Sequence, residues 1–345
     1  MKSPVVIAGP CSAESREQVL STAEALSAGG IRIFRAGVWK PRTRPGGFEG
    51  RGSVAFEWLQ EAHSRTGMQV CTEVATPHHV EEALKAGMDL LWIGARTTAN
   101  PFAVQELAEA LRGAGIPVLV KNPVNPDIEL WCGAIERLSA AGVEQIGLIH
   151  RGFSAYDRDI YRNVPLWHLP IEMKRRYPDI GLYCDPSHMG GRRELVAPIA
   201  QQALDLSYDG LFVEAHCNPD AALSDAQQQL TPAALLTLID RLTVRSNGSL
   251  PEAIASLRKQ IDGIDEEIMR LLARRQQLSG EIGDFKARRN MPVLQSDRYR
   301  EMIENRAELA RTLGLDESYV KAVMELIHRE SVRRQMQQGE QSTEA

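Results

Sequence analysis

The sequence lacks any apolar stretch approaching the roughly 20 residues that a membrane-spanning helix requires. Its first ten residues, MKSPVVIAGP, have neither the length nor the small-residue cleavage pattern of a signal peptide. Positive charge is not in excess, since 40 Lys and Arg stand against 45 Asp and Glu, for a net charge of −5. These absences predict no membrane partner and no nucleic-acid partner, so any anionic ligand must bind to a local cluster of cations.

Cysteine is also scarce, with five residues scattered along a chain of 345. An odd number without regular spacing argues against a disulfide framework and favours a cytoplasmic location. Most of the five should be small buried residues. The hydrophobic fraction of 43% and the charged fraction of 25% are ordinary for a folded protein, and the length favours two domains.

Short apolar runs recur along the N-terminal two thirds of the chain, and segments of helical periodicity lie between them. The runs occupy residues 4–8, 31–35, 69–73, 89–93, 117–121, 145–149, 180–184 and 210–214. Near-continuous apolar runs are typical of a parallel sheet that is covered on its faces. Eight such units in roughly 240 residues predict an α/β protein with a (β/α)8, or TIM, barrel. The alternative is an open doubly wound sheet, which usually has fewer strands and a glycine-rich first turn, unlike GPCSAES here.

The pattern changes at a short polar linker, predicted over 246–250. Beyond it, apolar residues at three-four spacing predict one helix over 250–289, about 60 Å long, and two shorter helices over 297–313 and 316–338. A lone helix of that length cannot bury its apolar stripe. The sequence therefore predicts a barrel domain over 1–245, a small all-α domain over 251–338 that forms a homodimer or a larger assembly, and a flexible tail over 339–345.

Every predicted strand is followed by a charged or metal-capable side chain, at the barrel end where catalytic groups lie. A single basic residue at such a place is more often a solvated surface group. Charged or metal-capable residues at the ends of all eight strands are not explained by chance. The cations suit phosphate and carboxylate, and they are Arg35, Lys40, Arg96, Lys121 and Arg151. The mixed sulfur, nitrogen and oxygen donors suit Mn²⁺, Fe²⁺, Co²⁺ or Zn²⁺ better than Mg²⁺ or Ca²⁺. These donors are Cys11, His188, Glu214 and Asp225.

The barrel segments resemble, in order, those of the 3-deoxy-D-arabino-heptulosonate 7-phosphate (DAHP) synthases of type Iβ. The matching segments are GPCSAES (9–15), RAGVWKPRT (35–43), TEV (72–74), IGAR (93–96), VKNP (120–123), HRGF (150–153), DPSH (185–188), VEAHCNPDAALSD (213–225) and QQQL (227–230). The resemblance implies that the four mixed donors bind a divalent metal ion, with Mn²⁺ favoured. It also implies that the five cations bind phosphoenolpyruvate.

The same resemblance assigns the second substrate, erythrose 4-phosphate, to Lys40-Pro41-Arg42-Thr43 and Asp185. It gives the handling of water and protons to Glu73, Lys121 and His188 without identifying the base. The related octulosonate 8-phosphate synthases are similar too. They typically carry a KANRS-like segment where this chain has KPRT, which favours the four-carbon aldose.

Residues 250–337 resemble the all-helical (AroQ-type) chorismate mutases, on motifs such as LLARR at 271–275 and ESV at 330–332. The resemblance implies a pocket for chorismate and prephenate lined by Arg258, Arg275, Lys286, Arg298 and Gln335. Arg275 and Lys286 lie about three turns apart on one helix face, whereas Arg258 points about 100° away and is expected to reach a neighbouring protomer. The usual acidic residues that recognise the substrate hydroxyl correspond here to Gln295 and Tyr299.

Together these features predict a bifunctional enzyme of aromatic amino acid biosynthesis. The barrel is expected to condense phosphoenolpyruvate with erythrose 4-phosphate, and the helical domain to rearrange chorismate to prephenate. No segment resembling a regulatory extension precedes the barrel, which motivates the expectation that prephenate bound to the helical domain inhibits the barrel reaction. The alternative is that the helical domain only dimerises and senses ligands.

Overall fold

The computed structural model describes residues 4–40, 46–156, 160–245 and 252–341. The predicted linker at 246–250 and the last four residues, 342–345, lie outside the described residues. The chain divides into two compact units, residues 1–246 and residues 247–345.

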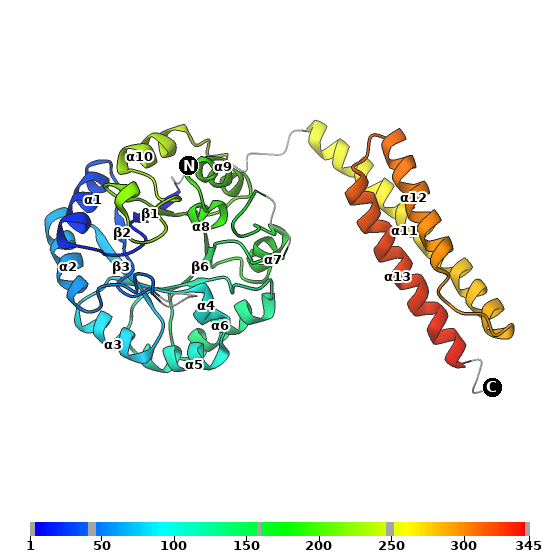
Figure 1. The fold of residues 1–345 in the computed structure, drawn as a ribbon, viewed down its shortest axis with the longest axis horizontal. Helices are drawn as coiled ribbons and strands as arrows, with labels where there is room; N and C mark the ends of the chain where they lie inside the picture. The colour runs from blue at the N-terminus through cyan, green and yellow to red at the C-terminus, as the bar shows by residue number, and fades with distance from the viewer. Residues whose placement is uncertain (1–3, 41–45, 157–159, 246–251, 342–345) are drawn as a thin grey trace. The chain divides into compact units, whose positions relative to one another are not determined.

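The first unit is a closed barrel of eight parallel strands surrounded by helices (Figure 1). The strands are β1 (Val5–Gly9), β2 (Ile33–Arg35), β3 (Gln69–Val74), β4 (Leu90–Ile93), β5 (Val118–Lys121), β6 (Ile146–His150), β7 (Gly181–Cys184) and β8 (Gly210–Glu214). The predicted barrel is confirmed, and each strand ends within two residues of its expected bounds. The open-sheet alternative is wrong, because β1 pairs with β8 along its whole length.

Helices follow the strands and cover the outside of the barrel (Figure 1). They are α1 (Arg16–Ala28), α2 (Val54–Thr66), α3 (Pro77–Lys85), α4 (Ala95–Thr98), α5 (Pro101–Ala110), α6 (Ile128–Ala140), α7 (His168–Arg176), α8 (Pro186–Gly190), α9 (Val196–Asp205) and α10 (Pro232–Arg241), with the 3-10 turns η1 (Arg193–Leu195) and η2 (Pro219–Ala221). Several begin at a residue whose side-chain oxygen accepts hydrogen bonds from the first-turn backbone, such as Thr76, Asn100 and Asp127. Such caps satisfy backbone donors that have no partner within the helix.

Two apolar clusters stabilise the barrel. The larger lies between the strands and the surrounding helices, and includes Cys132 and Cys184. The smaller fills the barrel interior and consists of Ile7, Cys71, Leu90, Trp92, Leu119, Ile149 and Phe212. Burial raises the pKa of the Cys71 thiol to about 12, which keeps it neutral. With the interior filled by apolar side chains, polar chemistry is confined to the strand ends.

The carboxyl end of β1 approaches β2 more closely than any side chain would allow. A Cβ atom at Gly9, where φ is +152°, would lie 2.1 Å from the carbonyl oxygen of Arg35. Only glycine fits at this position. Its absence of a side chain lets the chain carry Cys11, two residues later, over the end of the barrel.

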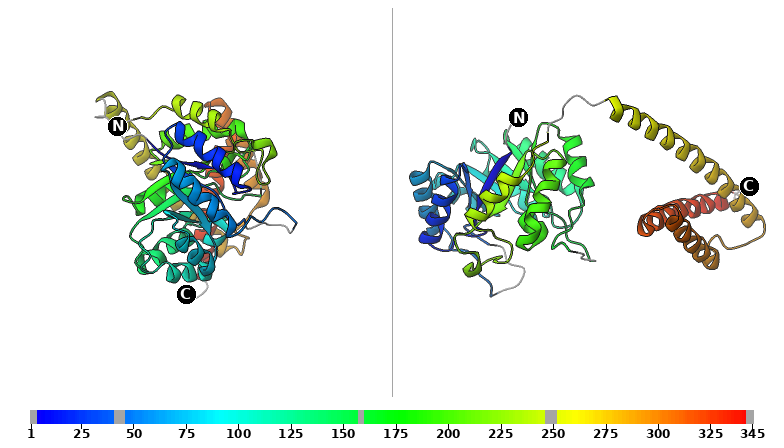
Figure 2. Two further views of the ribbon diagram at one scale, coloured as in Figure 1. Left: turned by 90° about the vertical axis from the view of Figure 1, so that its left-hand side faces the viewer. Right: turned by 90° about the horizontal axis from the view of Figure 1, so that it is seen from above.

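The second unit consists of α11 (Glu252–Arg288), α12 (Ser296–Thr312) and α13 (Glu317–Gln341). α13 packs against both other helices, and the N-terminal part of α11 extends beyond them (Figure 2). The three predicted helices are present, but α13 continues three residues past the expected end. The glycine at 339 does not end the helix, since a single glycine costs a helix only about 1 kcal/mol, and the flexible tail over 339–345 stays a prediction. Within the described ranges, none of the helices combines the length and apolar composition needed to cross a bilayer.

Candidate active sites

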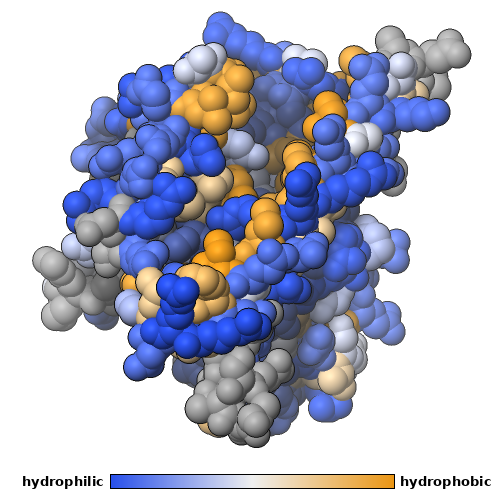
Figure 3. Space-filling model, turned by 90° about the vertical axis from the view of Figure 1, so that its right-hand side faces the viewer, coloured by the Kyte–Doolittle hydropathy of each residue, from blue (hydrophilic) through white to orange (hydrophobic). Residues whose placement is uncertain are grey.

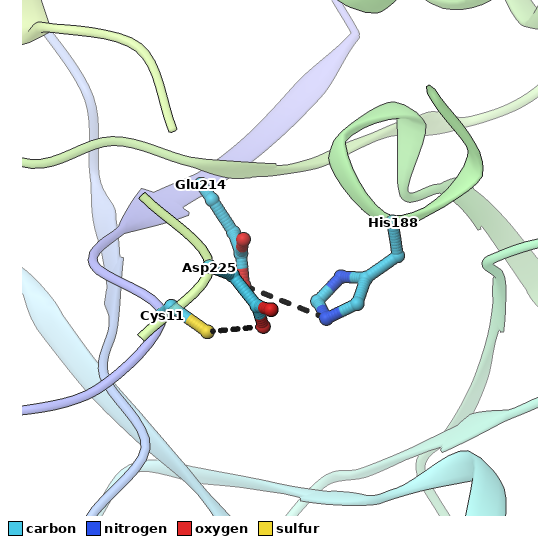
Figure 4. Close-up of side chains that lie close together, drawn as sticks. All are labelled: Cys11, His188, Glu214 and Asp225. Atoms are coloured by element: carbon cyan, nitrogen blue, oxygen red, sulfur yellow. Dashed lines mark hydrogen bonds and ion pairs between the residues drawn. The ribbon is translucent and has the colours of Figure 1, made fainter. Parts of the chain in front are cut away.

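Four side chains able to bind a metal ion converge at the carboxyl end of the barrel (Figure 4). Cys11 follows β1, His188 lies on α8, Glu214 ends β8 and Asp225 lies in the loop after β8. One donor atom from each lies within 4.8 Å of the others. The Cys11 Sγ atom is 3.1 Å from Asp225 Oδ2, and His188 Nε2 is 3.6 Å from Glu214 Oε1. This donor set fits a divalent transition-metal ion.

Burial and neighbouring charges shift the pKa values of His188 and Glu214 toward the forms that bind a metal ion, and the pKa of Cys11 away from it. Burial lowers the pKa of His188 against the opposing effect of Asp185 and Glu214, which favours the neutral imidazole that a ligand must be. The pKa of Glu214 stays below its usual value despite burial, mainly because of His188 and Arg35. Burial, with a contribution from Glu214, raises the pKa of the Cys11 thiol well above its usual value. The thiol is therefore the ligand whose proton a bound cation has to displace.

Arg35 is the cation most deeply enclosed near this cluster. Its side chain is 1% exposed, and its NH2 atom lies 3.3 Å from Glu214 Oε1. Its guanidinium lies over the rings of Trp92 and Phe212, at 4.9 and 4.5 Å from the centroids. Its Nε and NH1 atoms are buried without a hydrogen-bond partner. Buried donors without a partner are rare in proteins, so these two donors are available to an anionic ligand.

The other predicted anion-binding cations lie at the same end of the barrel. Lys40 Nζ is 2.5 Å from Cys11 Sγ, and Lys121 Nζ is 2.9 Å from Asp185 Oδ2. Burial lowers the pKa of Arg151 to about 10, and the nearby positive charges of Arg162 and Arg96 add to this effect. Positive charge is therefore concentrated around Arg151, as the binding of a phosphate requires.

Asp185 holds its neighbours in place. It is fully buried, its Oδ1 caps α8 by accepting the His188 backbone N–H at 3.0 Å, and its Oδ2 lies 2.7 Å from His188 Nδ1. Its pKa is held well below the usual value against burial, by His188 and Lys121. Glu73 Oε2 accepts the Trp92 indole N–H at 3.0 Å. The predicted aldose-binding residues Pro41, Arg42 and Thr43 lie outside the described residues.

Sequence reasoning missed two buried asparagines that orient Arg151. The Asn122 side chain accepts its backbone N–H at 2.7 Å, and Asn163 Oδ1 accepts from its NH1 at 2.6 Å. Asn163 also donates to the carbonyl of His188 at 2.6 Å. Asn122 could have been found, because it directly follows Lys121 at a strand end. Asn163 could not, since it lies in a long loop without periodicity.

The helical unit contains a pocket of about 450 Å³. Its lining includes four of the five predicted ligand-binding residues, namely Arg275, Lys286, Arg298 and Gln335. Arg275 NH1 donates to Ser331 Oγ at 2.5 Å, and Gln335 Nε2 donates to Ser279 Oγ at 3.0 Å. The fifth residue, Arg258, lies on α11 and is not part of the lining of this pocket within one chain.

Gln295 and Tyr299 also line this pocket. The Tyr299 ring lies 4.6 Å from the ring of His328, which is a lining residue as well. Burial and the nearby Arg275 and Lys286 lower the pKa of His328, which favours the neutral ring. The pocket thus combines cations with neutral polar groups and contains no acidic side chain in its described lining.

The fold and its sites define a barrel with a metal-capable, cation-rich end, and an all-α unit with a pocket that is lined partly by cations. The chain belongs to the DAHP synthetase I family, which matches residues 2–245, and residues 257–336 match chorismate mutase type II. The two domains are therefore fused on one chain.

Similar proteins support the assignment of the barrel. A phospho-2-dehydro-3-deoxyheptonate aldolase of Thermotoga maritima is 35% identical over 225 residues, 65% of this chain and 64% of that protein. The crystal structure of a DAHP synthase from Thermotoga maritima has a TM-score of 0.63 at 33% identity, covering 68% of this chain and 67% of that one. A 2-dehydro-3-deoxyphosphooctonate aldolase of Magnetococcus marinus is 29% identical over 257 residues, 69% of this chain and 85% of that protein.

Proposed function

We propose that this chain is a bifunctional enzyme of aromatic amino acid biosynthesis that acts in the cytoplasm. Its barrel condenses phosphoenolpyruvate with erythrose 4-phosphate to give DAHP and phosphate, and its helical unit rearranges chorismate to prephenate. The observation that carries the proposal is the convergence of Cys11, His188, Glu214 and Asp225 beside the buried donors of Arg35. Family membership of both domains supports it.

In the barrel, carbon 3 of phosphoenolpyruvate attacks the aldehyde carbon of the aldose, water adds to carbon 2, and phosphate leaves. A divalent ion bound by the four-residue cluster, for which we favour Mn²⁺, supplies Lewis-acid polarisation of the aldehyde carbonyl. Arg35, Lys121 and Arg151 bind the phosphate and carboxylate of phosphoenolpyruvate through charge-assisted hydrogen bonds. Holding both anions side by side makes the bond-forming step effectively unimolecular. Glu73 and His188 are the candidates for handling protons.

The similar proteins differ in the length of the sugar acid in their names, heptonate in one and octonate in the other. Similarity is higher to the heptonate aldolase, at 35% identity, than to the octonate aldolase, at 29%. We expect mass spectrometry of the product to detect the seven-carbon sugar phosphate with erythrose 4-phosphate as the substrate. Arabinose 5-phosphate, the five-carbon control, should give a kcat/KM lower by at least about 10-fold, because each added carbon must fit a pocket of fixed size. Equal or higher turnover of arabinose 5-phosphate would overturn the assignment of the aldose.

In the helical unit, the rearrangement of chorismate is unimolecular and needs no nucleophile or base. Arg275 and Arg298 would bind the two carboxylates and hold the reactive conformer. Lys286 and the amide of Gln335 would donate to the ether oxygen as negative charge develops on it. The absence of an acidic residue from the described pocket lining leaves the substrate hydroxyl to neutral groups such as Gln295 and Tyr299.

We propose that the helical unit forms a homodimer. A single chain leaves the apolar side chains of α11 exposed, among them Leu257 at 58%, Ile261 at 56% and Ile264 at 57%. Figure 3 shows groups of apolar side chains exposed among polar ones on the face that it draws. Exposed apolar patches of this kind are typical of protein–protein interfaces. Dimerisation would also bring Arg258 to the pocket of the partner.

Sedimentation velocity should therefore find dimers or larger assemblies of the wild-type protein, and monomers after Ile264→Asp, because a carboxylate would be buried without a partner. Mutase activity should fall with the loss of assembly. Lys259→Asp introduces the same side chain at an exposed polar position of the same helix and should leave the dimer intact. A wild-type monomer, or an assembly that survives Ile264→Asp, would contradict this proposal.

We further propose that prephenate inhibits the barrel reaction by binding to the helical pocket. Prephenate is a dicarboxylate, and Arg275, Lys286 and Arg298 supply positive charge to this pocket. The product of the mutase reaction would thereby limit the condensation in the barrel. The strength of this inhibition would depend on how much more tightly prephenate binds one state of the protein than the other.

A further inference from the structure

In each of the two carboxylates of the candidate metal centre, one oxygen faces the cluster and the other accepts a hydrogen bond from outside it. Glu214 Oε1 and Asp225 Oδ2 face the other members of the cluster (Figure 4). Their second oxygens are both held by hydrogen bonds from outside it. Glu214 Oε2 accepts from Gln228 Nε2 at 2.6 Å, and Asp225 Oδ1 accepts from Arg162 NH1 at 3.1 Å.

The two outer donors are themselves joined. Arg162 NH1 also donates to Gln228 Oε1 at 2.7 Å. The amide of Gln228 thus accepts at one end and donates at the other, which fixes its orientation. A continuous path of hydrogen bonds runs from Asp225 through Arg162 and Gln228 to Glu214, and it couples the orientation of one carboxylate to that of the other.

The surrounding backbone is built to maintain this path. Gln228 is 1% exposed, and Asp225 has a left-handed φ of +46°, a conformation that persists only where neighbours enforce it. Arg193 stabilises the segment 225–229 by donating hydrogen bonds to the backbone carbonyls of Ala226 and Gln229 at 2.9 and 2.8 Å. The stem of Arg162 crosses Gly191, where a Cβ atom would lie 2.6 Å from the Arg162 Cβ.

We propose that Arg162 and Gln228 are positioning residues that orient the two carboxylates of the metal centre. This inference rests on the proposed metal site. It gives a role to Gln228 of the QQQL segment (227–230), to which the proposed binding of the substrates assigns none. A hydrogen bond to the outer oxygen of a carboxylate ligand prevents rotation of the carboxylate. The ligand is then already oriented before the ion binds, and less conformational entropy is lost on binding. Losing such an outer partner typically weakens metal binding by roughly 10- to 100-fold.

The test is a Co²⁺ titration of the metal-stripped full-length protein, followed by the absorption of the thiolate-bound ion. Gln228→Met keeps the length of the side chain and removes both hydrogen bonds, and it should weaken Co²⁺ binding by roughly 10- to 100-fold. Gln227→Met makes the same change at the adjacent, exposed glutamine and should leave the affinity unchanged. Equal affinity of a folded Gln228→Met variant and the wild type would overturn the inference.

Arg162 gives a second test that does not depend on a buried substitution, because its side chain is 43% exposed. Arg162→Met should weaken Co²⁺ binding, and Arg162→Lys, which keeps the charge, should restore part of the loss. A purely structural role would lower the unfolding midpoint of the metal-free protein without changing its affinity for Co²⁺, and would overturn the inference. Failure of the wild type itself to bind Co²⁺ would instead overturn the proposed metal site.

Discussion

Replacing Cys11 with serine is expected to lower the synthase kcat/KM by at least about 100-fold. Loss of a residue that only hydrogen-bonds to a metal ligand typically costs roughly 10- to 100-fold, and loss of the ligand itself should cost no less. A serine hydroxyl matches the shape of the thiol but stays protonated near neutral pH, so it is a poor ligand for the ions that this donor set favours. Mutase activity should change by less than about twofold, because the substitution lies in the other domain. Both rates and the bound metal should be measured on the same preparation.

The matched control is Cys217→Ser, the same substitution at the exposed cysteine. It should leave both activities and the metal content unchanged. A Cys11→Ser variant that keeps full synthase activity at low metal concentration would exclude the thiolate as a ligand.

Replacing Arg275 with alanine is expected to lower the mutase kcat/KM by at least about 100-fold, the cost of no longer holding a substrate carboxylate in the reactive orientation. Its guanidinium lines the pocket and is fixed by Ser331 at 2.5 Å, so a substrate carboxylate would meet a donor already in place. The synthase rate without effectors should be unchanged. Added prephenate should no longer inhibit that rate, because the same side chain would hold the inhibitor.

Arg274→Ala is the control, since Arg274 is adjacent, exposed and not among the residues that line the pocket. It should behave like the wild type in both assays. Full mutase activity in Arg275→Ala would contradict the catalytic role of the pocket. Wild-type inhibition by prephenate in that variant would show that prephenate acts elsewhere.

The barrel could be predicted from the sequence because its strands are buried on both faces. Each strand is then a short apolar run, and β8 begins and ends at the residues that the pattern indicates. The ends of the helices were harder to place. The expected end of the last helix was residue 338, yet α13 continues through Gly339, because glycine in a helix costs only about 1 kcal/mol.

The candidate sites were predictable where chemistry coincides with a strand end. Cys11, Lys121 and Glu214 follow or end strands, so their position alone directs them to one end of the barrel. Asp225 lies in a loop and could be assigned only through the resemblance of its segment. Arg162 lies in the long loop after β6, and no local pattern encodes its contact with residues about 60 positions away.

The most direct measurement is an assay of both reactions on one purified sample, before and after removal of metal by a chelator. We expect the synthase activity to disappear and to return when Mn²⁺ is added, while the mutase activity stays the same throughout. Synthase activity that survives in metal-free protein, or a mutase activity that falls together with it, would contradict a metal-dependent barrel fused to a metal-independent mutase.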